Sequence, residues 1–421
     1  MEELLLKTIK ETADLMIRNI IAENMPEESV TQALKKHDFG SKSVYLVAIG
    51  KAAWTMAKAA TDYLGDRVEK GVVITKYDHA MGDLPRVDIY EAGHPTLDKN
   101  TVFATGKVLE MVSDLTEKHE VLFLVSGGGS ALFEAPLEGV TLDALAKLNN
   151  DMLACGADIV EMNMIRKRLS NVKAGRFAEI CQPASVFAVV LSDVLGDRLD
   201  TIASGPAAPD FSTSEDALAV VKKYNLELTA LQLEHLEKET PKSADNVKTV
   251  ITGSVRSLCE SASKTALSLG YTPYILTTTL NCEAAEAGRF LASIATDTIA
   301  GVTHFKKPCA IIAGGETVVN VKGDGKGGRN QELALAAATG IADLDHTLIF
   351  SLGSDGTDGP TDAAGGIVDG KTTEKLKALG LDLDQILNNN DAYHGLKAID
   401  GLIMTGPTGT NVNDVSVILC N

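Results

Sequence analysis

Paired cysteines, long apolar runs and an excess of positive charge are all missing from this sequence of 421 residues. The six cysteines form no CxxC pair and no metal-site spacing with histidine, so we expect reduced thiols in a cytoplasmic chain. No apolar run approaches the roughly 20 residues that a membrane-spanning helix needs. The formal net charge of −18 disfavours binding to nucleic acid or to an anionic membrane.

The sequence also has no low-complexity tract and no internal repeat, and 45% of its residues are hydrophobic while 23% are charged. This composition is typical of a globular protein, and the length predicts two domains. The first 21 residues carry acids early and apolar residues at helical spacing, which favours an amphipathic helix over a signal peptide. That helix could pack on either domain.

Short β-rich apolar runs alternate with helical patterns along the chain, which predicts an α/β fold with a mostly parallel sheet. The strands predicted first are Val44–Ile49, Val72–Thr75, Val87–Glu91, Val121–Val125 and Val186–Leu191. A polar stretch over 226–247 is predicted to connect the domains, giving boundaries of 1–240 and 241–421. The second series of strands is predicted at Thr249–Ile251, Pro273–Leu276, Ala310–Ala313, Val318–Lys322, Thr347–Leu352, Leu402–Met404 and Val415–Leu419.

Glycine-rich turns follow several of these strands, at the sheet edge where parallel α/β proteins bind ligands. The run Ser126-Gly127-Gly128-Gly129-Ser130 follows one strand and opens a helical turn, so its backbone N–H groups could bind phosphate. A plain tight turn is the alternative, but three successive glycines cost backbone entropy unless a close approach requires them. We also predict nucleotide-binding positions at Gly314, Glu316 and Asn411, which lie beyond other strands.

Two basic residues stand at predicted helix starts directly after glycines. Lys51 follows a strand and Gly50, and Arg329 follows GDGKGG. A cation at the positive end of a helix is locally unfavourable unless an anion is bound, although each could be a solvated surface residue. Phosphoryl transfer depends mainly on positioned positive charge, so this pair favours a kinase.

Acidic residues at strand ends are candidates for a metal site and for a general base. Asp355 and Asp358 lie among glycines, where carboxylates suit Mg²⁺; formation of Asx turns is the alternative reading. Asp193 and Glu316 could bind metal or accept a proton from a substrate hydroxyl. We assign Asp193 to catalysis, with the choice of base among Asp193, Glu316 and Asp355 open.

Other polar residues are assigned structural roles by default. His94, in Gly-His-Pro, is interpreted as a loop residue rather than a base. The segment NMIRKRLS, with Asn163, Arg166 and Lys167, is interpreted as a solvated helix face. The alternative for this segment is an arginine that binds a substrate carboxylate, because guanidinium matches carboxylate in a bidentate geometry.

Two literal motif matches point to other nucleotide-binding folds. Gly323, Gly325 and Gly328 match the dinucleotide fingerprint and keep a nicotinamide-dependent enzyme as a rival, although charged residues follow where small ones should pack. The run from Gly365 to Thr372 matches a P-loop, but a turn precedes it instead of a strand, which argues against a P-loop there. A non-catalytic protein that binds nucleotide or sugar acid is a third hypothesis.

Nine motifs occur together between Val44 and Asp414. They are LVAIGKAAWTMAKAA, YEAGHP, VLFLVSGGGSALFEAP, KRLSNVKAGRFAE, VLSDVLGDRLDTIASGPAAPD, GGETVV, GGRNQELALAA, GSDGTDGPTDAAGGIVDG and TGPTGTNVND. This set resembles the type II glycerate 2-kinases, which carry a C-terminal MOFRL module. One departure is Arg168, where many relatives have histidine, which removes a candidate histidine from this sequence.

The resemblance implies transfer of the ATP γ-phosphoryl group to the 2-hydroxyl of D-glycerate with a divalent metal, Mg²⁺. It implies a Rossmann-like N-terminal domain, a C-terminal α/β domain with a mixed sheet, and an active site in the interdomain cleft. The family's activity-linked lysine and arginine fall on Lys51 and Arg329. The expected partners are D-glycerate and ATP, in a monomer or homodimer. Some family members have been labelled hydroxypyruvate reductases, so an NAD(P)-dependent hydroxypyruvate or tartronate reductase is the alternative function.

Overall fold

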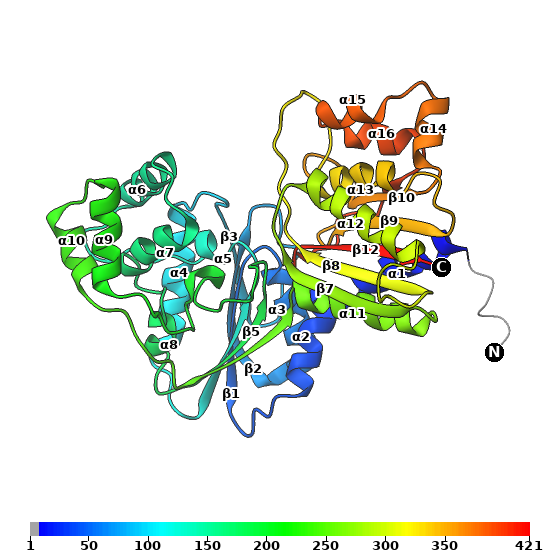
Figure 1. Ribbon diagram of the computed structural model, residues 1–421. Coiled ribbons are helices and arrows are strands. Elements are labelled where there is room, and N and C mark those ends of the chain that lie inside the picture. The colour runs from blue at the N-terminus through cyan, green and yellow to red at the C-terminus, as the bar shows by residue number, and fades with distance from the viewer. Residues whose placement is uncertain (1–7) are drawn as a thin grey trace. The chain divides into compact units, whose positions relative to one another are not determined.

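The structure is a computed structural model that describes residues 8–421 (Figure 1). These residues form two compact units. The N-terminal unit is Pro26–Thr252, and the C-terminal unit joins residues 8–25 to Gly253–Asn421. Helix α1 (Ile9–Glu23) therefore belongs to the C-terminal unit, and the first seven residues of the helix predicted from sequence lie outside the described range.

The N-terminal unit is built on a six-stranded sheet in the order β3-β2-β1-β4-β5-β6. Its strands are β1 (Ser43–Ile49), β2 (Val68–Lys76), β3 (Val87–Ala92), β4 (His119–Val125), β5 (Ser185–Leu191) and β6 (Val247–Gly253). The pairs from β3 through β5 are parallel, which confirms the predicted parallel sheet. Strand β6 differs from expectation, because the sequence placed it in the second series and it lies beside β5 instead.

Both faces of this sheet are covered by helices, which explains the continuous apolar runs of its strands. In β4, every residue from Glu120 to Val125 is buried. Helices α2 (Pro26–Lys35) and α3 (Ala53–Leu64) pack together, and α3 contacts β1 and β2, while α4 (Lys99–Val112) contacts β2 and β3. The strand order reverses between β1 and β4, and such a switch point is where open α/β sheets bind ligands.

A layer of helices with its own apolar core completes the N-terminal unit (Figure 1). It comprises α6 (Leu142–Ala154), α7 (Ile159–Arg168), α9 (Ser214–Tyr224) and α10 (Ala230–Glu237). Leu145, Met152 and Ile165 are among its buried residues. The stretch 226–247, predicted to connect the domains, contains α10 and therefore contributes to this layer.

The C-terminal unit contains a mixed sheet in the order β11-β10-β9-β12-β8-β7, as the family resemblance implied. The strands are β7 (Thr272–Leu280), β8 (Cys309–Gly315), β9 (Thr347–Gly353), β10 (Gly365–Asp369), β11 (Leu402–Ile403) and β12 (Asp414–Cys420). Only β7 and β8 pair in parallel among the pairings of this described sheet, and the others are antiparallel.

Helices cover both faces of the mixed sheet (Figure 1). On one face, α1 packs on α11 (Val255–Ser268), and α11 contacts β7, β8 and β12. On the other, α12 (Ala284–Ile299) packs on α13 (Arg329–Gly340), which contacts β9 and β10. Three short helices, α14 (Thr372–Ala378), α15 (Leu383–Asn388) and α16 (Ala392–Ala398), follow β10.

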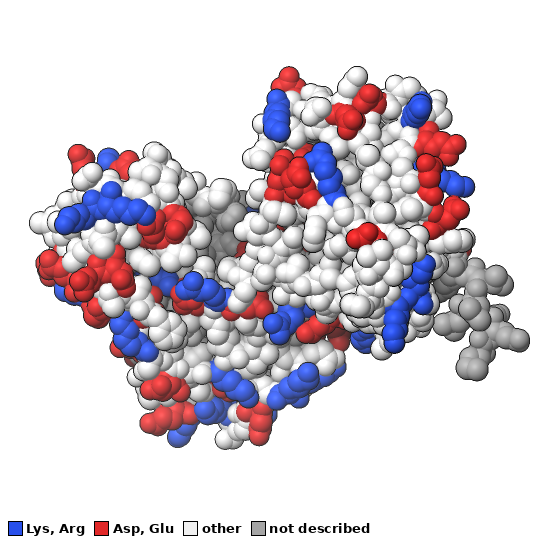
Figure 2. All heavy atoms as spheres, in the orientation of Figure 1, with Lys and Arg blue, Asp and Glu red and all other residues white. Residues whose placement is uncertain are grey.

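The strand predicted at Val318–Lys322 does not form. Val318 makes one isolated bridge with Glu283, and the Lys322 N–H donates to the Asn390 side chain at 2.7 Å rather than to a neighbouring strand. In the described chain no helix is both long and apolar enough to cross a membrane. On the face drawn in Figure 2, basic and acidic side chains alternate, and the described residues form no continuous basic surface there.

Candidate active site

The loops after β1 and β4 are hydrogen-bonded to each other at the switch point of the N-terminal unit. The Lys51 N–H donates to the Gly127 carbonyl at 2.9 Å, and the Ser126 N–H donates to the Ile49 carbonyl at 3.0 Å. Gly50 has a φ of +113°, and a Cβ there would lie 2.3 Å from Ser126 Oγ. Only glycine fits this position, so the sequence pairs the two loops through local backbone requirements.

Each glycine of the Ser126–Ser130 loop lies in close contact with another residue. A Cβ on Gly127 would lie 2.4 Å from Asp193 Oδ2, one on Gly128 would lie 2.9 Å from the His94 ring, and one on Gly129 would lie 2.9 Å from Ala203 Cβ. The N–H groups of Gly127 and Gly128 enter no backbone–backbone hydrogen bond in the described parts of the chain. The loop therefore presents backbone donors that no backbone carbonyl accepts, and donors of this kind bind anions.

The side chain of Lys51 lies beside this loop. Its Cγ would be 3.5 Å from a Cβ on Gly128, and its ammonium is in none of the ion pairs formed by the described residues of the N-terminal unit. His94, which follows β3, touches the same glycine. Burial lowers the pKa of His94, and the positive charge of Lys51 lowers it further, so both effects favour the neutral imidazole.

The ends of β1, β3, β4 and β5 thus bring together site residues predicted from the sequence and one residue, His94, that was not predicted. Lys51, Ser126–Gly129 and Asp193 follow β1, β4 and β5, as the sequence analysis proposed. His94 is the addition, since the sequence analysis interpreted it as a loop residue. Its position directly after a strand was the one available signal.

A buried ion pair is hydrogen-bonded to the last residue of the loop, Ser130. Ser130 Oγ hydrogen-bonds Ser204 Oγ at 3.0 Å, and the Lys173 ammonium donates to the Ser130 carbonyl at 2.8 Å. Lys173 also forms an ion pair with Glu134, and neither side chain is more than 4% exposed. Neither member of this pair is among the site residues predicted from the sequence.

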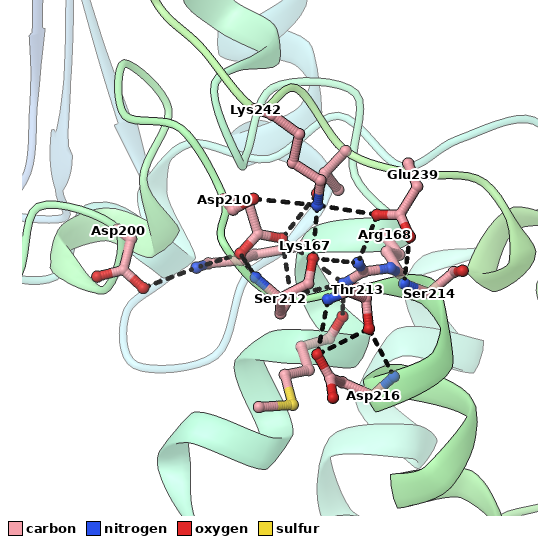
Figure 3. A network of polar contacts seen from close by, with 12 residues as sticks. Lys167, Arg168, Asp200, Asp210, Ser212, Thr213, Ser214, Asp216, Glu239 and Lys242 are labelled. Atoms are coloured by element: carbon pink, nitrogen blue, oxygen red, sulfur yellow. Dashed lines mark hydrogen bonds and ion pairs between the residues drawn. The ribbon is translucent and has the colours of Figure 1, made fainter.

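The cations of α7 are not a solvated face, which corrects the default interpretation. Lys167 reaches Asp200 at 3.4 Å and Asp210 at 3.3 Å, and it is 4% exposed (Figure 3). Arg168 is fully buried and donates to Ser212 Oγ and to the Ser212 carbonyl, each at 2.8 Å (Figure 3). Both residues therefore hold the helical layer together.

In the C-terminal unit, Arg329 is the first residue of α13 and is held by two acids. Its Nε donates to Asp414 Oδ2 at 2.6 Å, and its Nη1 donates to Glu316 Oε1 at 2.9 Å. Burial would lower the pKa of Arg329, but the Asp414 and Glu316 carboxylates outweigh it and raise that pKa. The structure joins the predicted residues Arg329 and Glu316, and it adds Asp414.

The two predicted metal ligands differ in their surroundings. Asp358 is 3% exposed and accepts the N–H groups of Asn330 at 3.2 Å and Gln331 at 2.9 Å, at the N-terminus of α13. Burial raises the pKa of Asp358 to about 6. Asp355 Oδ1 accepts the Thr357 N–H at 3.0 Å, which is an Asx turn. No group of three or more acidic, histidine or cysteine side chains in the described residues is placed to hold a metal alone.

The remaining predicted binding residues lie on different parts of the C-terminal unit. Gly314 is a buried residue of β8, where a Cβ would lie 2.5 Å from both Cys259 Sγ and Val255 Cγ1. Packing under α11 therefore accounts for this glycine. Asn411 lies in the loop before β12 and accepts the Asn413 N–H at 3.4 Å. A pocket of about 640 Å³ has Arg329 and Asp355 in its wall.

The glycines of GDGKGG are occupied by contacts within the C-terminal unit. The N–H of Gly323 donates to Asn390 Oδ1 at 3.1 Å, and that of Gly325 donates to the Asn389 carbonyl at 2.9 Å. No strand leads directly into the motif in the described structure, since β8 ends at Gly315, so its context is not that of a dinucleotide site. The literal P-loop match begins inside strand β10, which confirms that it is not a phosphate loop.

Comparison with known proteins gives matches over nearly the whole chain. Residues 12–237 match a domain of unknown function, DUF4147, and residues 309–414 match the MOFRL family. A D-glycerate 2-kinase of Thermotoga maritima is 53% identical over 98% of each chain. A glycerate 2-kinase of Pyrococcus horikoshii is 41% identical over 89% of this chain and 87% of its own length.

The fold agrees with these matches. The crystal structure of the Thermotoga maritima glycerate kinase superposes with a TM-score of 0.95 at 52% identity, covering 98% of this chain and 99% of that one. A relative from Agrobacterium vitis, 37% identical over 89% of this chain and 98% of its own, is named as a candidate hydroxypyruvate reductase. Sequence, fold and the motifs around Lys51 and Arg329 agree: the chain belongs to the type II glycerate 2-kinase family, the glycerate kinases that carry a MOFRL module.

Proposed function

We propose that this protein transfers the γ-phosphoryl group of ATP to the 2-hydroxyl of D-glycerate, giving 2-phosphoglycerate and ADP. The observation that carries the proposal is the loop pair of the N-terminal unit. The N–H groups of Gly127 and Gly128, which no backbone carbonyl of the described unit accepts, lie beside Lys51, and the ammonium of Lys51 is in none of the ion pairs of that unit. Phosphoryl transfer needs such positioned positive charge around the phosphate oxygens.

Individual roles follow from the contacts. Lys51 and the Ser126–Ser130 loop bind phosphate oxygens, and Arg329 binds a substrate anion with its orientation fixed by Asp414 and Glu316. Asp193 accepts the proton of the 2-hydroxyl while the hydroxyl oxygen of the substrate attacks the γ-phosphorus and ADP leaves. Gly314, Glu316 and Asn411 remain proposed nucleotide-binding positions. The packing of Gly314 limits that residue to a backbone role.

A divalent metal fits the donor set only in part. Asp355 has one oxygen in an Asx turn, while both oxygens of Asp358 already accept N–H groups of α13. We therefore propose that Asp355 contributes to Mg²⁺ binding and that Asp358 mainly caps α13. Because Mg²⁺ commonly takes one or two carboxylates together with phosphate oxygens, it would neutralise phosphate charge here when ATP is bound.

A reductase is the second candidate, favoured by the name of the Agrobacterium vitis relative. Against it, the N–H groups of Gly323 and Gly325 in the GDGKGG motif donate within the protein and are not open to a dinucleotide. Oxidation of NADH in the presence of hydroxypyruvate, followed at 340 nm, would support the reductase.

We also propose that the protein is a cytoplasmic enzyme and that it works as a monomer or homodimer.

The direct test is a coupled ADP-release assay with D-glycerate and Mg-ATP, followed by phosphorus NMR of the product. We expect ADP release that depends on glycerate and a product signal coupled to the proton at C2. Absence of ADP release from the folded protein contradicts the kinase activity. A signal coupled to the C3 protons contradicts only the choice of hydroxyl.

A further inference from the structure

Arg166 differs from the other cations of the N-terminal unit that lie near the Ser126–Ser130 loop. Lys167 and Arg168, its neighbours on α7, are paired with acids, and Lys173 is paired with Glu134. The guanidinium of Arg166 makes no ion pair or hydrogen bond to the residues that the structure describes. It is partly buried, so it is neither a solvated surface residue nor a satisfied core residue.

The position of Arg166 on α7 places it on the face that meets the loop. Asn163 and Arg166 are three residues apart, which puts them on one helix face. Asn163 Oδ1 accepts a hydrogen bond from Ser204 Oγ at 3.3 Å, and Ser204 in turn bonds Ser130 Oγ at 3.0 Å. A chain of hydrogen bonds thus runs from this face of α7 to the last residue of the glycine loop.

The charged side chains around Arg166 carry one net positive charge, which a bound anion would balance. Glu134 and Lys173 are close enough for their charges to act on Arg166 and on each other. Lys173 neutralises Glu134, so the group keeps one unbalanced positive charge, that of the guanidinium. A partly buried guanidinium without a counter-ion is costly, and an anionic ligand removes that cost.

We propose that Arg166 binds the carboxylate of the hydroxy-acid substrate and so determines which three-carbon alcohols the enzyme accepts. The proposal rests on the kinase function, because it deepens the same site. The N–H groups of the loop and Lys51 provide for phosphate at the start of the loop, while Arg166 lies near Lys173, which donates to the Ser130 carbonyl at the other end. A guanidinium binds carboxylate through two parallel hydrogen bonds, and the carbon that bears the 2-hydroxyl of glycerate is directly bonded to that carboxylate.

The test is the binding and use of D-glycerate and of glycerol, which lacks the carboxylate, by the wild type and by Arg166→Gln. Calorimetry without ATP should show the Kd for D-glycerate rising roughly 30- to 100-fold in the variant. In the kinetic assay, the preference of the enzyme for glycerate over glycerol should fall by a similar factor. The KM for ATP should stay within about threefold, which separates a carboxylate from a phosphate as the bound group.

Arg176→Gln is the matched control, because Arg176 is also a partly buried arginine but donates to the Lys167 and Ser170 carbonyls. We expect it to lower the melting temperature and to leave the glycerate Kd within about threefold. Arg166→Lys keeps the charge and loses the bidentate geometry, so it should weaken glycerate binding by about tenfold even if the glutamine variant fails to fold.

The binding arm does not depend on phosphoryl transfer, so the two proposals can fail separately. If the wild type binds glycerate without turnover, the kinase function is contradicted. The role of Arg166 is then still tested by the glycerate Kd values of the wild type and the Arg166 variants. Unchanged glycerate affinity in both Arg166 variants, an equal loss in Arg176→Gln, or no glycerate binding by the wild type would each overturn the inference. A rise in the KM for ATP with unchanged glycerate affinity would assign Arg166 to phosphate instead.

Discussion

Lys51 and Arg329 follow glycines near the starts of helices in the two units, but the structure treats their charges differently. Lys51 lies beside open backbone donors, without an acid partner in the described part of its unit. Arg329 is fixed by three hydrogen bonds to Asp414 and Glu316. The same sequence pattern thus gives an open positive charge in one case and an oriented, balanced one in the other. A pattern of glycines and a cation does not by itself distinguish the two.

The largest expected effect on turnover comes from substitution of Lys51. Lys51→Ala should lower kcat by about 10³-fold, because positioned charge on the transferring phosphoryl group is lost. Its stability should stay close to that of the wild type, since no ion pair within the described unit is broken. Lys58→Ala is the control: Lys58 lies on the exposed side of α3 and pairs with Asp62 at 2.5 Å. Steady-state kinetics with D-glycerate would contradict the comparison if both variants behaved alike.

Arg329 should show loss of activity together with loss of stability. Arg329→Met should lower kcat/KM by about 10²-fold and the free energy of unfolding by about 2 kcal/mol, because Asp414 is left buried without its partner. Adding Asp414→Asn should restore much of the stability and none of the activity. Urea denaturation and kinetics on the single and double variants measure both quantities. Recovered activity in the double variant would show that Arg329 matters only as a partner for Asp414.

The sequence predicted most strands of both sheets and the loops at the switch point because those signals are local, but it missed β10 and placed β6 in the second series, and the mixed second sheet was implied only by the family resemblance. The strands around Lys51 and Ser126 are continuous apolar runs, and glycines mark their ends. It could not predict Asp414 as the partner of Arg329, since the two residues are 85 positions apart. The ion pair of Glu134 and Lys173 depends on packing between separate elements in the same way. The burial of the α7 cations was likewise invisible, because their acid partners lie in later loops.

A smaller effect is expected from the open loop. Gly128 has a φ of +85°, and a Cβ would meet the His94 ring at 2.9 Å. Gly128→Ala should therefore raise the KM for ATP by about tenfold and lower stability by about 1–2 kcal/mol. Gly106→Ala is the control, because Gly106 lies inside α4 with nothing within 4 Å of its added Cβ. That change should raise the melting temperature slightly; an equal KM in both variants would contradict the role of the loop.

The smallest effect on turnover is expected from Asp358, and its signature is pH-dependent stability. Its pKa is raised from 3.8 to about 6, so the folded state holds this proton more tightly than the unfolded state does. The stabilisation is therefore fully present below pH 4 and is lost as pH rises through 6. Relative to Asp358→Asn, the wild type should lose up to about 3 kcal/mol between pH 4 and pH 7, measured by urea denaturation at each pH. A constant difference between the two proteins would show that the carboxylate is ionised across this range.

The discontinuous C-terminal unit has a consequence for synthesis of the chain. Asn24, at the end of α1, hydrogen-bonds Ser261 of α11 at 3.0 Å across a separation of 237 residues. At translation rates of about 5–20 residues per second, α1 leaves the ribosome roughly 12 to 50 seconds before its packing partner. The whole of Pro26–Thr252 is made in that interval. The apolar side of α1, with Met16 and Ile20 fully buried in the finished protein, must therefore stay unaggregated while the rest of the chain is made.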